Sequence, residues 1–467
     1  MSETLGSPQR PLRVAVVGSG PSGFYTVGAL AKAADVECRV DVFDRLPTPY
    51  GLVRGGVAPD HQNIKNVIRV YRKLTLDPGF RFFGNVEIGT VLDVDELRRH
   101  YDQVVFAVGN ESFRTIGVPG EDLDGIFSAT EFVGWYNGHP DFDHLDFALD
   151  DVERVAVVGN GNVAMDVARV LAKNPDGLAK TDIAAHAVET LRRSSVREIL
   201  VLGRRGPAQA AFTTKEIKEI GGLEEIDVVI PPADAELDEL SRRWLDENGS
   251  TGAKNNVEYL TQRSAEAPRG LDRTMVFEFL TSPIEFLGHG GRLEAVKLER
   301  NELYEDDRGT PRPRGTGEHR IENVQLALTA VGYRGVPMPG LPFDERNGVL
   351  PNDEGRIQDA NGNRLAGLYT VGWAKRGPTG LIGSNVADAA ETVRHMMSDL
   401  TAGDVRSAEI DDPDALSAML GAKGLRVVSF ADWESLDAIE VERGEAVGKI
   451  REKFTDVNGM LAALDGG

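Results

Sequence analysis

Apolar positions are arranged in two ways along the chain: in short runs bounded by glycine, and in longer stretches where they recur at helical spacing. The first apolar run, residues 13–17, leads into a glycine-rich loop at 18–23, a helical stretch at 24–33 and a second apolar run at 39–43. Strands that alternate with helices in this way are typical of a parallel sheet with crossover helices. The pattern therefore predicts an α/β protein that begins with a βαβ unit.

The same pattern returns later in the chain. An apolar run at 154–158 precedes a glycine-rich loop at 159–164 and a helical stretch that ends near residue 173. Another helical stretch, at 182–193, intervenes before the apolar run at 198–202. This imperfect duplication predicts two Rossmann-like dinucleotide-binding domains in one chain.

The loop of the first unit has the spacing of a dinucleotide-binding fingerprint, with Gly18, Gly20 and Gly23 between a strand and a helix. Such glycines allow a tight turn, a close approach of the pyrophosphate and close packing of helix on strand. The start of the helix then presents backbone N–H groups to phosphate. Asp44 ends the next strand, where a carboxylate can accept hydrogen bonds from ribose hydroxyls.

The loop of the second unit carries Gly159 and Gly161, with Ala164 in the third position. Arg204 and Arg205 end its second strand, where the first unit has an acid. Guanidinium groups bind a 2′-phosphate that a carboxylate would repel. The second unit is therefore predicted to bind NADP(H), and the other dinucleotide is most simply FAD.

Two further apolar runs end in glycine, at Gly109 and Gly332, and each can mark a crossing between domains. We predict that the NADP domain is inserted in a discontinuous FAD domain. The expected segments are 1–115 for the first part of the FAD domain, 116–330 for the NADP domain, 331–400 for the second part of the FAD domain and 401–467 for a C-terminal helical extension. Within these segments the sequence predicts an exposed loop at 306–318, a helix from about 381 to 398, and helices around 433–443 and 446–464.

Composition narrows the possible functions of the 467-residue chain. A formal net charge of −22 argues against a broad basic face for nucleic acid and against adsorption to an anionic membrane. Cys38 is the single cysteine, which excludes an internal disulfide, a CxxC redox pair and a cysteine-held iron–sulfur cluster. The polar first eleven residues contain no apolar stretch of signal-peptide length, and no run reaches the length of a membrane span, so we expect a cytoplasmic protein. The histidines and aspartates at 139–144 lack the spacing of a calcium loop, and no metal site is predicted.

Seven ordered motifs make the chain resemble the adrenodoxin-reductase-like ferredoxin:NADP reductases, in particular the bacterial form. They are LPTPYGLVR at 46–54, GVAPDH at 56–61, FVGWYN at 132–137, GRRGP at 203–207, FTTKE at 212–216, FLTSPIE at 279–285 and GWAKRGPTG at 372–380. The resemblance covers residues 13–398 and, more loosely, the tail. It implies an enzyme that moves hydride from NADPH to FAD and passes single electrons to an iron–sulfur ferredoxin.

The resemblance also implies which residues contact the cofactors. The expected FAD contacts are Ser22, Asp44, Leu52, Trp373, Gly380, Leu381 and Ile382. The expected NADP(H) contacts are Arg114, Asn160, Gly161, Asn162, Val163, Arg204, Arg205, Glu216 and Gly380. A helix that starts near Leu381 would also point its N-terminal N–H groups at the flavin edge where negative charge gathers on reduction.

Hydride transfer needs no side-chain acid, because the flavin and the nicotinamide carry the electrons. The family places the histidine of the GVAPDH motif near both rings. His61, Asp166 and Glu219 are therefore expected to help with positioning, proton movement or charge balance. Glu219 follows Glu216 by three residues on a predicted helix, so the two lie on a similar face. A purely structural role for His61 stays open.

The electron acceptor implied by the resemblance, a ferredoxin, is commonly acidic, while this chain is itself acidic. A local basic face must then guide docking. Arg242 and Arg243 form one candidate face, and Arg69, Arg72 and Lys73 form another. Two alternatives stay open: an electron-transfer subunit like the small chain of glutamate synthase, although such chains generally carry cysteine clusters, and a nucleotide-binding sensor without turnover.

Overall fold

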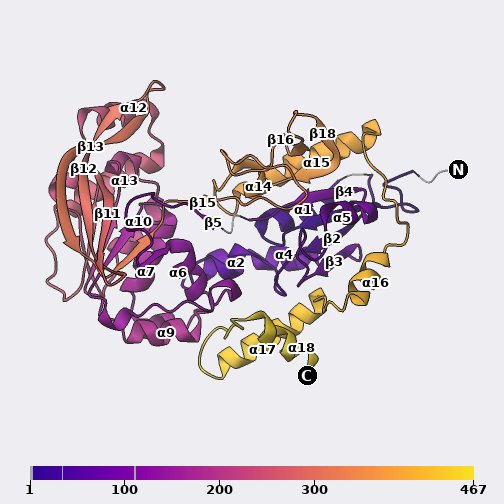
Figure 1. The fold of residues 1–467 in the computed structure, drawn as a ribbon, viewed down its shortest axis with the longest axis horizontal. Coiled ribbons are helices and arrows are strands. Elements are labelled where there is room, and N and C mark those ends of the chain that lie inside the picture. The colour runs from indigo at the N-terminus through magenta and orange to yellow at the C-terminus, as the bar shows by residue number, and fades with distance from the viewer. Residues whose placement is uncertain (1–3, 34, 110–111, 467) are drawn as a thin grey trace.

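A computed structural model describes residues 4–33, 35–109 and 112–466 of the chain. The first three residues of the polar N-terminal stretch, and residues 110 and 111 of the predicted first FAD segment, lie outside the described residues. Two α/β units lie side by side, and the C-terminal residues run along one edge of both (Figure 1).

The first unit is built on a seven-stranded sheet with the order β16-β17-β18-β4-β1-β2-β3. Its strands are β1 (Leu12–Val17), β2 (Cys38–Phe43), β3 (Phe80–Phe83), β4 (Gln103–Phe106), β16 (Asn352–Asp353), β17 (Arg356–Gln358) and β18 (Arg364–Thr370). The strands from β18 to β3 pair in parallel, whereas β16 and β17 pair antiparallel at one edge. The strand β18 comes late in the chain yet pairs with β4, so this sheet needs residues from both sides of the second unit.

Alternate residues of β1 face opposite sides of the first sheet and enter different cores. Val14 and Val16 pack with Phe24 and Met396, whereas Ala15 and Val17 pack in the core that contains Leu97. The helices of this unit are α1 (Pro21–Leu30), α2 (Leu52–Gly55), α3 (Gln62–Lys65), α4 (Ile68–Leu74), α5 (Val94–His100), α14 (Trp373–Arg376) and α15 (Ser384–Ala402). Burial on both faces explains why the strand sequences are continuously apolar rather than alternating.

The second unit is built on a six-stranded parallel sheet with the order β6-β14-β7-β8-β10-β9. Its strands are β6 (Ile126–Ser128), β7 (Arg154–Val158), β8 (Glu198–Leu202), β9 (Asp227–Val229), β10 (Thr274–Glu278) and β14 (Leu326–Thr329). Its helices are α6 (Ala129–Tyr136), α7 (Asn162–Ala172), α8 (Pro175–Leu178), α9 (Ala185–Arg192), α10 (Thr214–Gly221), α11 (Pro232–Ala235), α12 (Glu239–Asn248) and α13 (Thr251–Ser264). Short 3₁₀ turns stand at Pro140–Phe142, Leu149–Asp151 and Pro207–Gln209.

A three-stranded antiparallel sheet extends the second unit, with β11 (Thr281–His289), β12 (Arg292–Glu305) and β13 (Pro311–Asn323). The prediction of an exposed loop at 306–318 is therefore wrong for most of that stretch. The polar composition misled the prediction, because β13 is a solvent-exposed edge strand. Its side chains pair across the strands, as Arg314 does with Glu302 at 2.6 Å, instead of entering a core.

The chain crosses between the units twice, and the crossings pair with each other. The strands β5 (Ser112–Phe113) and β15 (Tyr333–Arg334) form a two-stranded antiparallel sheet between the two units (Figure 1). The two sheets and this paired crossing confirm the predicted fold class, two Rossmann-like units with one inserted in the other. The residue boundaries of the domains stay predictions.

The C-terminal extension contains α16 (Ala415–Ala422), α17 (Phe430–Glu445) and α18 (Val457–Asp465). The predicted helix at 446–464 is wrong in its first half. Gly448 has a φ of 74°, and a Cβ on Gly444 would collide with the backbone of Arg451. The chain therefore doubles back on α17 before α18 begins.

Other helix ends differ from the prediction for local reasons. Pro21, which lacks an N–H, stands in the first turn of α1, so the helix starts before residue 24. The side chain of Asp238 accepts a hydrogen bond from the Ser241 N–H, and α12 starts directly after it. Among the described residues, no helix combines the length and apolar character needed to cross a membrane.

Candidate active site

The first glycine fingerprint has the geometry of a dinucleotide cradle. Gly18 has a φ of 108°, and a Cβ there would lie 2.6 Å from the carbonyl oxygen of Ala107. A Cβ on Gly23 would collide with the carbonyl oxygen of Gly18, so the turn and the helix pack without side chains. A Cβ on Gly20, in contrast, would have its nearest neighbour 4.0 Å away, at the Cα of Gly51. Open space at the second glycine is what the approach of a pyrophosphate requires.

Asp44 and Ser22 bind protein groups around this loop. The Asp44 carboxylate accepts hydrogen bonds from the backbone N–H of Ser19 and of Leu46, each at 3.0 Å, and from the Ser19 hydroxyl. Burial raises the pKa of Asp44, and these hydrogen bonds oppose that effect. The Ser22 hydroxyl donates to Asn385 Oδ1 at 3.0 Å, which joins the start of α1 to α15. Both residues therefore lie at the predicted cofactor site and also hold the loop in shape.

The segment after β18 lies against the same loop. A Cβ on Gly372 would collide with the Ser22 side chain, and the ring of Trp373 lies 5.0 Å from that of Tyr333 on the crossing strand β15. Leu381 and Leu52 leave 63% and 38% of their surfaces exposed, unusual for leucines but expected where a cofactor ring would cover them. The helix predicted to start near Leu381 begins three residues later, at Ser384, whose hydroxyl accepts a hydrogen bond from the Leu381 N–H.

The second fingerprint repeats this geometry. Gly159 has a φ of 131°, and a Cβ there would lie 2.5 Å from the carbonyl oxygen of Ala330. A Cβ on Gly161 would have no neighbour within 4 Å, and Ala164 is fully buried where helix meets strand. Asn162 Oδ1 accepts a hydrogen bond from the Thr213 N–H at 2.8 Å, which ties the start of α7 to the segment before α10. Asn160 and Val163 flank these positions in the same loop and first turn.

Arg204 and Arg205 follow β8, as predicted. Within the described ranges, no carboxylate forms an ion pair with either guanidinium group, and Arg204 is exposed. Burial lowers the pKa of Arg205, and the nearby charges of Arg204 and Arg312 lower it further. Two guanidinium groups without a carboxylate partner at the end of a strand suit a dianionic phosphate. Arg114 lies elsewhere, directly after β5, where its Nε donates to the Tyr333 carbonyl at 3.4 Å.

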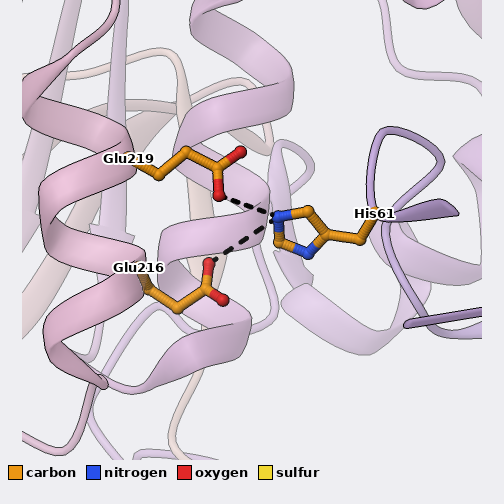
Figure 2. A group of neighbouring side chains, drawn as sticks. All are labelled: His61, Glu216 and Glu219. Atoms are coloured by element: carbon orange, nitrogen blue, oxygen red, sulfur yellow. Dashed lines mark hydrogen bonds and ion pairs between the residues drawn. The ribbon is translucent and has the colours of Figure 1, made fainter. Parts of the chain in front are cut away.

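A cluster of charged side chains joins the two units. Figure 2 shows His61, from the loop before α3, pointing toward Glu216 and Glu219 on α10. His61 Nε2 lies 3.1 Å from Glu219 Oε2 and 4.0 Å from Glu216 Oε2. Its other ring nitrogen lies 3.7 Å from Asp166 on α7. The residues predicted as catalytic, together with Glu216, therefore meet at one place, although they come from separate parts of the chain.

Arg169 is the centre of this cluster and is fully buried. It donates to both oxygens of Asp60 at 2.9 and 3.0 Å, to Asp166 at 2.7 Å and to Glu216 at 3.2 Å. Burial alone would raise the pKa of Asp60, but the hydrogen bonds and charge of Arg169 outweigh it and hold that pKa well below its usual range. Burial raises the pKa of Asp166 and of Glu216, and the nearby charge of Asp166 raises the pKa of Glu216 further, because the carboxylates packed around the imidazole repel one another.

Comparisons with known proteins agree with this architecture. Residues 12–200 match the family described as pyridine nucleotide-disulphide oxidoreductase. The NADPH-ferredoxin reductase FprA of Mycobacterium tuberculosis (strain ATCC 25618 / H37Rv) is 45% identical over 460 residues, covering 97% of this chain and 99% of that protein. The chain belongs to the adrenodoxin-reductase-like ferredoxin:NADP reductases. The mitochondrial NADPH:adrenodoxin oxidoreductase of Arabidopsis thaliana is 40% identical over 473 residues, covering 97% of this chain and 95% of its own.

The solved structure of Mycobacterium tuberculosis FprA in complex with NADPH superimposes on this reductase with a TM-score of 0.91. The two chains are 43% identical, and the match covers 98% of this chain and 100% of the other. The arrangement of two units around a paired crossing is therefore that of the reductase family.

The geometry of His61, Glu216 and Glu219 is compatible with a metal ion, since one ligand atom from each lies within 4.8 Å of the others. The charges around them argue against a divalent ion. Arg169 lies 3.2 Å from Glu216 and 3.6 Å from Glu219, and Lys173 lies 3.8 Å from Glu219, so a cation would meet two positive charges. In this reductase the side chains of His61, Glu216 and Glu219 therefore belong to an ion-pair network and not to a metal site.

Arg169, Asp60 and Lys173 were not among the predicted site residues. Lys173 Nζ binds Asp60 at 2.7 Å, so both cations of the second unit hold an acid of the first. The sequence contains a pattern that indicates this network. Asp166, Arg169 and Lys173 are spaced by three and four residues along a mostly apolar helix and its C-cap, which places their charged side chains on one face. Asp60 stands next to His61 within the GVAPDH motif.

Proposed function

We propose that the chain is an FAD-dependent ferredoxin:NADP(+) oxidoreductase that takes hydride from NADPH and delivers single electrons to an iron–sulfur ferredoxin. One observation carries this conclusion: two dinucleotide cradles stand on two sheets of one chain, and His61 of the first unit reaches Glu219 of the second at 3.1 Å. The identity of 45% with a NADPH-ferredoxin reductase over nearly the whole chain supports the same activity.

FAD is assigned to the first unit and NADP(H) to the second. The first unit would comprise 1–115 and 331–400, the second 116–330, and the extension 401–467. Toward FAD we propose contacts from Ser22, Asp44, Leu52, Trp373 and Gly380 to Ile382. Toward NADP(H) we propose Arg114, Asn160 to Val163, Arg204, Arg205, Glu216 and Gly380. Support comes from the open space at Gly20 and Gly161 and from the unneutralised guanidinium groups at the end of β8.

When bound, the nicotinamide supplies a hydride, and the flavin accepts it and releases electrons one at a time. The residues of the chain bind, orient and balance charge around that exchange. Arg204 and Arg205 would hold the 2′-phosphate, and the N-terminus of α7 would offer its backbone N–H groups to the pyrophosphate. His61 Nε2 shares a proton with Glu219 Oε2, and Asp166 with Arg169 fixes the opposite side of the imidazole ring. These side chains hold the two units in register and keep a proton at the His61–Glu219 contact.

Anaerobic addition of NADPH to the purified holoprotein tests this proposal. The visible absorbance of bound flavin should bleach, and steady-state reduction of cytochrome through ferredoxin should follow. Protein that carries no flavin, or flavin that stays oxidised with NADPH bound, would refute the proposal. The second result would instead indicate a nucleotide-binding sensor without turnover.

Ferredoxin docking is proposed on one of two basic faces. Arg242 on α12 donates to the Leu237 carbonyl, and its neighbour Arg243 pairs with Glu305. On α4, Arg72 is partly neutralised by Glu434 and Asp437 of the extension. Each face therefore has one arginine paired with carboxylate, and charge alone does not separate the face around Arg242 from the face around Arg72. Unchanged ferredoxin-dependent turnover of Arg242→Glu at low salt would exclude the face around Arg242.

We also propose that the enzyme works in the cytoplasm, where NADPH is regenerated, and the acidic, cysteine-poor composition agrees with this location. Fractionation of cells that express the protein, followed by immunodetection, tests it. Recovery with the membrane or in the medium would contradict the proposal.

A further inference from the structure

The C-terminal extension packs along the first unit. Trp433 lies edge-on to the ring of Tyr50, with centroids 5.9 Å apart, and is 2% exposed. Arg54 stacks over the Trp433 ring at 5.0 Å, and its Nη1 donates to buried Glu440 at 2.8 Å. A backbone bridge between Gly84 and Val428 adds a further tie. Residues 428–440 are therefore held firmly on the FAD-side unit.

The stretch between α17 and α18 then reaches the second unit. In Figure 1 this C-terminal segment runs below the place where the two units meet. The Lys449 ammonium donates to the Ile183 carbonyl at 2.6 Å, and Glu452 accepts from the Ala185 N–H at 3.3 Å. The extension thus contacts the start of α9 in the second unit as well as α2 in the first.

Lys453 is the residue of this stretch that touches both units with one atom. Its Nζ lies 3.2 Å from the Arg54 carbonyl of the first unit and 3.0 Å from the Asn137 carbonyl of the second. The same atom lies 3.1 Å from Asp182 Oδ2, also in the second unit. The side chain is almost completely buried, with 3% of the residue exposed.

Asp182 also binds a second buried lysine. Lys65, from α3 of the first unit, donates to Asp182 Oδ2 at 2.6 Å and Oδ1 at 2.9 Å. Two lysines, one from the extension and one from the first unit, therefore share a single carboxylate of the second unit. Losing one partner of such a buried group leaves uncompensated charge, which is strongly unfavourable. The contacts are therefore specific to one relative position of the units.

We propose that Lys453 is a positioning residue that holds the two units at the angle needed for hydride transfer, a role that rests on the function proposed above. Within the described residues, the chain connections between the units are the crossings that carry β5 and β15, strands of two residues each. So thin a covalent link resists rotation poorly, and non-covalent contacts between the units, the Arg169 network and the Lys453 bridge, must fix the angle. Lys453 adds hydrogen bonds to backbone carbonyls on both sides. A neutral amine still has two N–H donors, so these two bonds survive even when the lysine loses its proton.

The perturbation is Lys453→Met, which keeps the length of the side chain and removes its donors. The matched control is Lys423→Met in the same extension, because Lys423 Nζ donates to the Val91 carbonyl of the first unit alone. Hydrogen exchange by mass spectrometry should rise in residues 137–139 and 181–186 and around β5 and β15 in Lys453→Met, but not in the control. Flavin content should stay at the wild-type value, because the proposed FAD contacts all lie within the first unit. The Kd for NADPH should change by less than about threefold, because most of its proposed contacts lie within the second unit.

Stopped-flow measurement of flavin reduction by saturating NADPH gives the second readout. The limiting rate should fall about tenfold in Lys453→Met, since a misplacement of the order of 1 Å slows a positioned reaction by up to about a hundredfold. A purely structural role would change unfolding but leave the rate per bound flavin unchanged.

The outcomes separate this inference from the proposed function. Wild-type flavin that NADPH does not reduce would contradict the function itself. Wild-type reduction with an unchanged rate and unchanged exchange in Lys453→Met would overturn the role of Lys453 alone. If Lys453→Met does not fold, Asp182→Asn tests the same bridge from the other side. Wild-type exchange and rate in a folded Asp182→Asn protein would equally overturn it.

Discussion

Replacing both Arg204 and Arg205 by alanine should turn an NADPH-specific enzyme into one that barely distinguishes NADPH from NADH. The two guanidinium groups follow β8, next to the second cradle, and have no carboxylate partner among the described residues. Their mutual repulsion, with Arg312 nearby, lowers the pKa of Arg205 after burial has done so. A 2′-phosphate relieves that repulsion, whereas the 2′-hydroxyl of NADH does not.

The size of the effect follows from the exposure of each group. A hydrogen bond to a charged partner contributes about 1.5–3 kcal/mol. Arg204 is exposed and belongs at the lower end, so its loss should weaken NADPH by roughly tenfold. Arg205 is partly buried and belongs higher, at roughly a hundredfold. The double variant should therefore lose about a thousandfold of its preference if the two contributions add.

Steady-state kinetics with ferricyanide as acceptor, under NADPH and then NADH, measure this preference as a ratio of kcat/KM values. Arg314→Ala is the control, because Arg314 is an exposed arginine of the second unit that pairs with Glu302. A double variant whose preference changes less than about threefold would refute the assignment of Arg204 and Arg205 to the 2′-phosphate. An equal loss with both cofactors would instead indicate a damaged fold.

Three further outcomes are expected. Gly161→Val should weaken NADPH binding at least about tenfold while flavin content and the unfolding midpoint stay unchanged, because a side chain there meets open space in the protein but fills the pyrophosphate approach. Isothermal titration measures the binding, and urea unfolding measures the midpoint. Gly159→Ala should instead lose about 1–3 kcal/mol of stability, because Gly159 has a positive φ and its Cβ would meet the Ala330 carbonyl. Arg169→Met should lower the free energy of unfolding by about 3–5 kcal/mol, measured by urea titration, because the buried acids around it lose their partner. A loss of less than about 1 kcal/mol would contradict the central role of Arg169. Burial lowers the pKa of Lys453 from 10.5 to about 7, so unfolding takes up a proton between those values and stability should rise with pH across that window. Burial also lowers the pKa of Lys65, so Lys453→Met should show a smaller rise than the wild type rather than none, and parallel curves for the two proteins would contradict the contribution of Lys453.

The parts of the fold that were predicted correctly follow from local sequence patterns, namely apolar runs and glycine spacing. Continuous apolar runs at β1, β7 and β8 are buried on both faces, and glycine spacing marks the two loops because a side chain at Gly18 or Gly159 meets backbone. The predictions failed where tertiary pairing decides the structure. The strand β13 is polar because it is an exposed edge, and no local pattern separates it from a loop. Likewise the turn after Gly444 depends on its contact with Arg451.

The predicted site residues were drawn from motifs, and motifs report residues near cofactors better than residues that support them. His61 was found in a motif and Glu219 from its spacing to Glu216, and the structure brings the two to 3.1 Å. Arg169 was missed because an arginine on a helix is usually solvated, and only the packing of the two units shows that it is fully buried. Lys453 lies in a tail without motifs, and its two carbonyl partners are separated from it by most of the chain.

The place of β18 in the first sheet sets an order on biosynthesis. A ribosome releases β1 to β4 early, but β4 pairs with β1 on one side and with β18 on the other. The latter strand emerges only after the whole second unit has been translated. The inserted unit can therefore close its own sheet first, while the nascent N-terminal half waits with an open strand edge. Protecting that edge during synthesis is a demand that this topology places on the cell, and it ends when residues 364–370 dock.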